Sequence, residues 1–201
     1  MDDRKDVTRE VWLKEATLLI EKQILSKHNI KLPENWTVSV GFPAGSPKAI
    51  GQAWDKESCD DKKTYSLFIS PVLGNQDKVN LLQVLLHEII HIAVGIDQKH
   101  GGEFKRVARL VGLEGRLTAT YVSESNPLHA QLENVYNDVG WAYPHEVLLP
   151  KFKPKKERQS NILQLVSPSD SEYIIKMKKD IFENEGAPFD RNGEEMIVVE
   201  E

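Results

Sequence analysis

The feature that most constrains this chain is the fourteen-residue stretch Leu81–Val94, which is apolar except at four positions. Those four are Gln83, His87, Glu88 and His91. A helix that is apolar nearly all round is buried inside a domain, and this one is too short and too polar to span a bilayer. We therefore expect a central buried helix from about Asp77, with Gly95 placed to end it.

Three of the polar positions form the pattern His87-Glu88-Ile89-Ile90-His91. Histidines four residues apart lie one turn above each other on a helix, so both imidazoles can reach one ion. Glu88 lies beside that face, where its carboxylate can reach a zinc-activated water, as in metalloprotease helices. Burying these groups without partners costs several kcal/mol, which an ion would offset. The competing interpretation is a set of ordinary core hydrogen bonds.

A hydrolytic zinc site needs a third protein ligand and one open coordination position. His100 follows the helix after one short loop, and Gly101 and Gly102 give the backbone freedom to fold it back. Glu103 is the competing third ligand, although its charge also suits the first turn of the next helix. Asp97 is a more distant competitor. The sequence favours His100.

The rest of the pattern up to about residue 150 predicts an α+β domain, in which helices pack on a short, mostly antiparallel sheet. We expect further helices at 7–28, 102–110 and 127–139, and strands at 36–40, 51–54 and 64–70. We interpret Thr64–Ser70 as an exposed edge strand that could pair with an extended peptide.

A basic, proline-interrupted segment, Lys151–Arg158, marks a change in composition along the chain. We place a catalytic domain at residues 1–153 and a small β-rich appendage at 154–201. Within the appendage we expect strands at 161–166, 172–177 and 195–199, and a helical turn near 180–184.

Taken together, the motifs resemble the SprT-like zinc metalloproteases, over about residues 10–165. The likeness is carried by His87–His91, His100-Gly101 and Phe104–Arg106. It continues through Gly112–Thr120 and Tyr143–His145, which are similar to the bacterial and phage branch. The resemblance implies a zincin-like catalytic domain with one zinc ion held by His87, His91 and His100, and Glu88 as the general base.

Relatives in this family often end in a zinc ribbon with paired cysteines. Here the matching segments are Ser167–Ser171 and Phe189–Gly193, with serines and an aspartate where thiolates are expected. Serine is not a competent structural zinc ligand. We therefore interpret the appendage as a zinc ribbon that has lost its cysteine ligands.

Three residues are candidates for accessory roles in the site. Tyr121 could donate to a developing oxyanion, His145 could approach the cleft, and Glu103 could approach the metal. The more ordinary interpretations are that Tyr121 is a packing aromatic, that His145 is a loop histidine, and that Glu103 is an acidic residue at the start of a helix.

Composition narrows the choice of partners. A net charge of −5 gives no overall basic field for nucleic acid or an anionic membrane, although Lys151–Arg158 and Lys176–Lys179 are local basic clusters. The single cysteine excludes an internal disulfide. The first residues lack the pattern of a secretory signal, so we expect a cytoplasmic protein.

The leading functional hypothesis is a zinc endopeptidase acting on a protein or peptide substrate. One alternative is a DNA-associated protease that cleaves DNA-bound proteins, which the eukaryotic relatives imply. The other is a non-catalytic binding module that zinc only braces.

Overall fold

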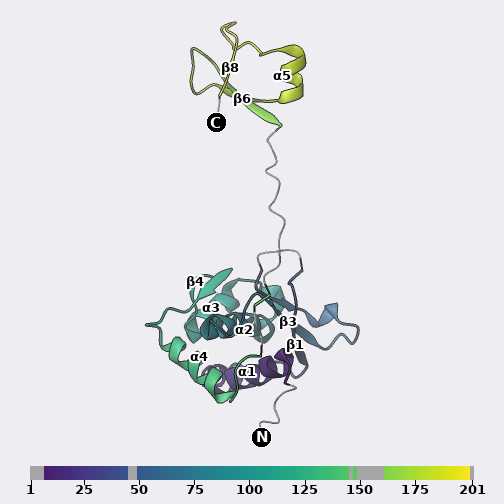
Figure 1. Cartoon of the computed structure of the whole chain (residues 1–201), viewed down its shortest axis with the longest axis vertical. Helices are drawn as coiled ribbons and strands as arrows, with labels where there is room; N and C mark the ends of the chain where they lie inside the picture. Colours follow the sequence, from purple (N-terminus) through teal and green to yellow (C-terminus); the bar gives the residue numbers. More distant parts are fainter. Residues whose placement is uncertain (1–6, 45–48, 145–146, 149–160, 200–201) are drawn as a thin grey trace. The chain divides into compact units, whose positions relative to one another are not determined.

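The computed structural model describes residues 7–44, 49–144, 147–148 and 161–199. The chain divides into two compact units, Met1–Leu149 and Pro150–Glu201 (Figure 1). The boundary expected between residues 153 and 154 lies outside the described residues. Helices combine with small sheets, which confirms the predicted α+β class. None of the helices within the described ranges is long and apolar enough to cross a membrane.

The N-terminal unit is built on a three-stranded sheet in the order β1-β3-β2. Strands β1 (Trp36–Val40), β2 (Gly51–Trp54) and β3 (Tyr65–Ile69) agree closely with the predicted strands. Strand β1 runs parallel to β3, with Val38 opposite Leu67, and β2 runs antiparallel to β3, with Ala53 opposite Leu67. Because β3 lies between the other two, its central Leu67 is fully buried.

The position of β3 corrects the expectation that Thr64–Ser70 is an exposed edge strand. Both of its sides are hydrogen-bonded, one to β1 and the other to β2. Alternation along a strand tells which side chains face the core, but it does not tell which neighbours the strand has. Among the described strands, the edges of this sheet are β1 and β2.

Helix α2 (Lys78–Val94) is the central element of the N-terminal unit. The Asp77 side chain caps it by accepting from the backbone N–H of Asn80, at 3.0 Å, and Gly95 ends it at a φ of +100°. Six aliphatic side chains of the helix are completely buried, and each contributes about 1.5–3 kcal/mol. They are Leu81, Leu82, Leu85, Leu86, Ile89 and Ile90. This packing fixes the helix axis, and with it the direction of the polar side chains.

The other helices of this unit pack around α2, and the first of them also packs against β1 (Figure 1). Helices α1 (Arg9–Gln23), α3 (Gly102–Val111) and α4 (Pro127–Asp138) were each expected. The first differs from its predicted range, because its last residues form a separate 3-10 turn, η1 (Leu25–His28). Another 3-10 turn, η2 (Lys56–Ser58), lies between β2 and β3.

A short hairpin that the sequence did not predict follows α3. Strands β4 (Glu114–Arg116) and β5 (Ala119–Tyr121) pair antiparallel. The Arg109 guanidinium fixes the start of the hairpin by donating to the carbonyls of Leu113 and Gly115. At Gly115, where φ is +77°, a Cβ would lie 2.7 Å from the Tyr121 ring, so the tyrosine covers this glycine closely. The hairpin packs β5 against α2.

The C-terminal unit contains a second three-stranded sheet, in the order β7-β6-β8. Its strands are β6 (Ile162–Val166), β7 (Ile174–Lys178) and β8 (Ile197–Val198), all antiparallel, and α5 (Lys179–Glu185) follows β7. The three strands and the helical turn expected from the sequence are therefore confirmed.

The turns of the C-terminal unit are held by hydrogen bonds around one carboxylate. Asp190 is buried and accepts from the Ser167 hydroxyl at 2.5 Å and from the backbone N–H groups of Asn192 and Glu194 at 2.8 and 2.9 Å. The Ser167 hydroxyl holds the pKa of Asp190 below its usual range. Ser167, Asp190 and Asn192 belong to the two segments where the resemblance places metal ligands. Descent from a zinc ribbon stays a prediction.

Candidate metal site

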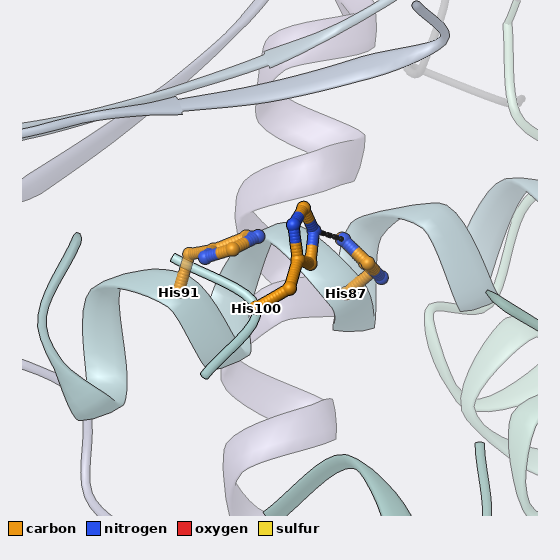
Figure 2. A group of neighbouring side chains, drawn as sticks. All are labelled: His87, His91 and His100. Carbon is orange, nitrogen blue, oxygen red and sulfur yellow. Dashed lines mark hydrogen bonds between the residues drawn. The ribbon is translucent and has the colours of Figure 1, made fainter. Parts of the chain in front are cut away.

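Three imidazoles converge on one small volume of the N-terminal unit (Figure 2). His87 and His91 project from successive turns of α2, and His100 comes from the turn after η3 (Ile96–Gln98). One ring nitrogen from each histidine lies within 4.8 Å of the others, and the Nε2 atoms of His87 and His100 are 3.3 Å apart. These three residues could hold a metal ion. No second group of this kind occurs in the described parts of the chain.

Burial keeps all three imidazoles in the neutral form. It lowers the pKa of His87 to about 4 and that of His91 to about 3, and the neighbouring histidines add to both shifts. The pKa of His100 is lowered too, mainly by burial. At neutral pH each ring therefore carries a free nitrogen lone pair. Three neutral imidazoles sharing one volume fit a borderline-soft divalent ion such as zinc.

Phe104 of α3 forms the wall behind the three rings. It is fully buried, and its ring centroid lies 4.3 Å from that of His91, 4.9 Å from that of His87 and 5.1 Å from that of His100. The His91 ring stacks on it with only 27° between the planes. Phe104 therefore restricts the rotation of every histidine in the group.

Thr120 of β5 fixes the orientation of His87. Its hydroxyl oxygen lies 3.0 Å from His87 Nδ1, so Nδ1–H can donate to it and leave Nε2 as the free lone pair. Nε2 is also the atom that faces His100. Thr120 belongs to the family motif Gly112–Thr120 but had no predicted role, because nothing local to the sequence links it to His87.

Glu88 is buried beside the histidines and has an unusually high proton affinity. Its side chain is 7% exposed, and burial raises its pKa to about 8. Within the described residues no group hydrogen-bonds its carboxylate. Gly51 of β2 lies against it, since a Cβ there would come within 2.5 Å of Oε1. The absence of a side chain at Gly51 is what gives the carboxylate room.

The turn that carries His100 has a backbone conformation that favours glycine. Gly101 N–H donates to the Gln98 carbonyl at 2.7 Å, which closes a β-turn. Its second residue, Lys99, has φ 47° and ψ −122°, close to the type II′ geometry that glycine dominates. A non-glycine residue held there costs about 1–3 kcal/mol.

An open pocket of about 330 Å³ lies next to the histidines. Its lining consists of Ala53, His91, Ile96, Lys99 and His100. Ala53 belongs to β2, so the edge strand beside the site is β2.

The free side of β2 presents backbone groups for pairing. Ser70 N–H donates to the Ile50 carbonyl at 2.9 Å, so the backbone of Ile50 faces β3. Hydrogen-bonded residues alternate along an antiparallel pair, so the backbone N–H and C=O of Gln52 also face β3. The N–H and C=O groups of Gly51 and Ala53 consequently face away from β3, where no described strand pairs with them.

Two of the accessory candidates, Glu103 and Tyr121, do not join the three histidines. Glu103 is exposed in the first turn of α3 and pairs with Arg106, through contacts of 2.6 and 2.9 Å. Tyr121 is 52% exposed and covers Gly115, and strand alternation turns it to the side opposite Thr120. His145 lies outside the described residues. Asp97, the distant competitor, is exposed and accepts from the Gln98 amide at 3.1 Å.

The fold and the site define a metallopeptidase-like domain, because a buried helix places two histidines and a glutamate beside a third histidine. The sequence model of the SprT-like family matches residues 22–123, about half of the 201-residue chain. The chain belongs to the SprT-like family, which confirms the resemblance. Comparisons with curated proteins and with solved structures found no match.

The matched region contains α2, His100 and Thr120, and it ends before the C-terminal unit. The bacterial or phage branch and the zinc-ribbon origin of the appendage are outside what the match covers. Both stay predictions.

Proposed function

We propose that this protein is a zinc-dependent endopeptidase, with His87, His91 and His100 as the metal ligands and Glu88 as the general base. The observation that carries the proposal is the juxtaposition of three neutral imidazoles with a buried carboxyl group of raised pKa. When bound, the ion would supply Lewis-acid activation of a peptide carbonyl and of water.

The residues around the ion have separate tasks in this proposal. Glu88 takes a proton from the attacking water and returns it to the leaving amine. A pKa of about 8 in the metal-free protein gives this carboxylate a proton affinity suited to transfer near neutral pH. Thr120 holds His87 in the tautomer that leaves Nε2 free, and Phe104 limits the rotation of the rings.

We place the substrate backbone along the free edge of β2. The outward N–H and C=O groups of Gly51 and Ala53 can pair with an extended peptide, which is recognition through the main chain. Ala53 also lines the pocket beside His91 and His100, so a peptide bound there would pass close to them.

Edge pairing can be tested with Ala53→Pro, because the N–H it removes faces away from β3. The expected result is a folded protein with several-fold weaker peptide binding. Binding equal to that of the parent would reject the edge. The same change at Phe68 is unsuitable, because Phe68 belongs to the central strand.

Two variants test the assignment of the catalytic site. Glu88→Gln should keep one zinc per chain, measured by elemental analysis, and lose cleavage of an unfolded protein such as casein. His91→Ala should lose both zinc and cleavage. His28→Ala is the matched control, because His28 belongs to η1 and lies outside the histidine group. Full zinc content in His91→Ala, or parental turnover in Glu88→Gln, would overturn the assignment.

The binding-module alternative makes a different prediction for the same variants. If zinc only braces the core, parent and Glu88→Gln behave alike and neither cleaves protein. The burial of Glu88 without a hydrogen-bond partner in the described chain favours catalysis, because a bracing site has no use for a buried acid.

A further inference from the structure

The turn that presents His100 contains a lysine where the backbone favours glycine. Lys99 has φ 47° and ψ −122° in the turn closed by Gly101 N–H and the Gln98 carbonyl. Glycine would adopt this conformation at no steric cost. The backbone of the turn therefore does not account for a lysine, and residues strained in this way cluster at active sites and ligand-binding sites.

A second lysine with positive φ among the described residues provides a comparison. Lys62, at φ 53°, lies in the turn after η2, and its ammonium group donates to the Glu57 carbonyl. That contact gives Lys62 a local structural role. In the described part of the chain, the Lys99 ammonium group has no hydrogen bond or ion pair of this kind.

Lys99 instead lines the pocket at the three histidines. Of the five lining residues, Ala53 and Ile96 are apolar, and His91 and His100 are proposed zinc ligands. Lys99 is therefore the lining residue whose ammonium group is available to a substrate side chain. Ala53 of β2 lines the same pocket, so a peptide paired with β2 would bring its side chains into the pocket that Lys99 lines.

We propose that Lys99 is a specificity-determining residue that selects peptides with an aspartate or glutamate side chain close to the scissile bond. This inference rests on the proposed peptidase function. An ammonium–carboxylate pair at the rim of an open pocket is partly screened, so we expect about a fivefold preference in affinity. The preference should shrink as salt is raised.

Binding to an inactive protein isolates this preference from cleavage. The probes are fluorescein-labelled octapeptides that differ only in carrying Glu, Gln or Lys, placed in turn at each of the central positions. Their dissociation constants for the zinc-loaded, full-length Glu88→Gln protein are measured by fluorescence anisotropy. The Glu peptide should bind about fivefold more tightly than the Gln peptide for at least one position.

Three substitutions in that background test the role of the side chain. Lys99→Gly, which suits the backbone, should remove the preference for Glu, and Lys99→Glu should reverse it in favour of the Lys peptide. Lys62→Gly, the matched positive-φ control, should leave the preference intact. The proposal is overturned if Lys99→Gly keeps the preference, if Lys99→Gly weakens all three peptides equally, or if the unsubstituted background has no preference.

Cleavage of the same peptides by the protein with Glu88 intact separates the two hypotheses. A preference that depends on Lys99 but is accompanied by no cleavage would reject the peptidase function and support acidic recognition. Cleavage that is indifferent to Glu, Gln or Lys would support the peptidase and reject the role of Lys99.

Discussion

The raised pKa of Glu88 makes a measurable prediction about the stability of the metal-free protein. Its pKa is 4.5 in the unfolded chain and about 8 in the folded protein, because burial disfavours the charged form. Between pH 4.5 and about pH 8, the folded state therefore keeps a proton on Glu88 that the unfolded state has released. The stability that this proton contributes is fully present below pH 4.5 and is lost as the pH rises through 8.

The size of the effect follows from this difference in pKa. One pH unit in this window is worth about 1.36 kcal/mol, so the contribution of Glu88 should fall by about 3 kcal/mol between about pH 5 and pH 8. Glu88→Gln cannot titrate. The free energy of unfolding of the variant, minus that of the parent, should therefore rise by about 3 kcal/mol over the same range.

Urea titrations in the presence of a chelator measure this difference. All four tryptophans of the chain, Trp12, Trp36, Trp54 and Trp141, belong to the N-terminal unit, so their fluorescence follows the unit that contains Glu88. The histidines, whose lowered pKa values reduce stability below pH 6.5, are present in both proteins, so their effect cancels. A difference that stays flat from about pH 5 to 8 would refute the reasoning. Saturating zinc should remove most of this pH dependence of the difference in stability, because a nearby cation favours the ionised form of the Glu88 carboxylate.

Three further predictions concern residues outside the histidine group. Thr120→Val removes the acceptor of His87 Nδ1 and should weaken zinc binding about 10–100-fold; unchanged affinity in competition with a chromophoric chelator would contradict it. Gly51→Ala places a Cβ 2.5 Å from Glu88 Oε1, which should cost about 1–3 kcal/mol of stability and abolish cleavage at full zinc content. Parental activity in that variant would show that Glu88 does not depend on the glycine. The lowered pKa of Asp190 stabilises the C-terminal unit above the ordinary value of 3.8, and this contribution is lost as the pH falls through the folded value. Asp190→Asn should therefore reduce amide protection at neutral pH and flatten its decline in acid, and identical exchange profiles would exclude this role.

Local pattern was enough to place the main helix and the two histidines that it carries. The spacing of His87 and His91 puts them on one face by helix geometry alone, and the cap at Asp77 and the stop at Gly95 act within one turn of the helix ends. The glycines after His100 similarly predicted that it folds back. These interactions connect residues close in sequence, so a linear pattern contains them.

The surroundings of the site depended on contacts that no linear pattern specifies. The strand at 64–70 was predicted correctly, but it was predicted to be an edge. Strand order is set by the parallel pairing of β1 with β3, and β2, which lies between them in the sequence, pairs on the other side of β3. The β4-β5 hairpin was missed because its strands are only three residues long, too short for a clear alternation.

The sequence by itself determined that two imidazoles and a carboxylate share one buried helix, because 3.6-residue periodicity fixes which side chains are neighbours. Only the tertiary structure decided what completes the group. Thr120 of β5 contacts His87 from 33 residues away in the sequence, and Gly51 of β2 packs against Glu88 of α2. Such contacts form only when the packing of the whole unit brings distant segments together, since the free energy that selects them is shared among many side chains.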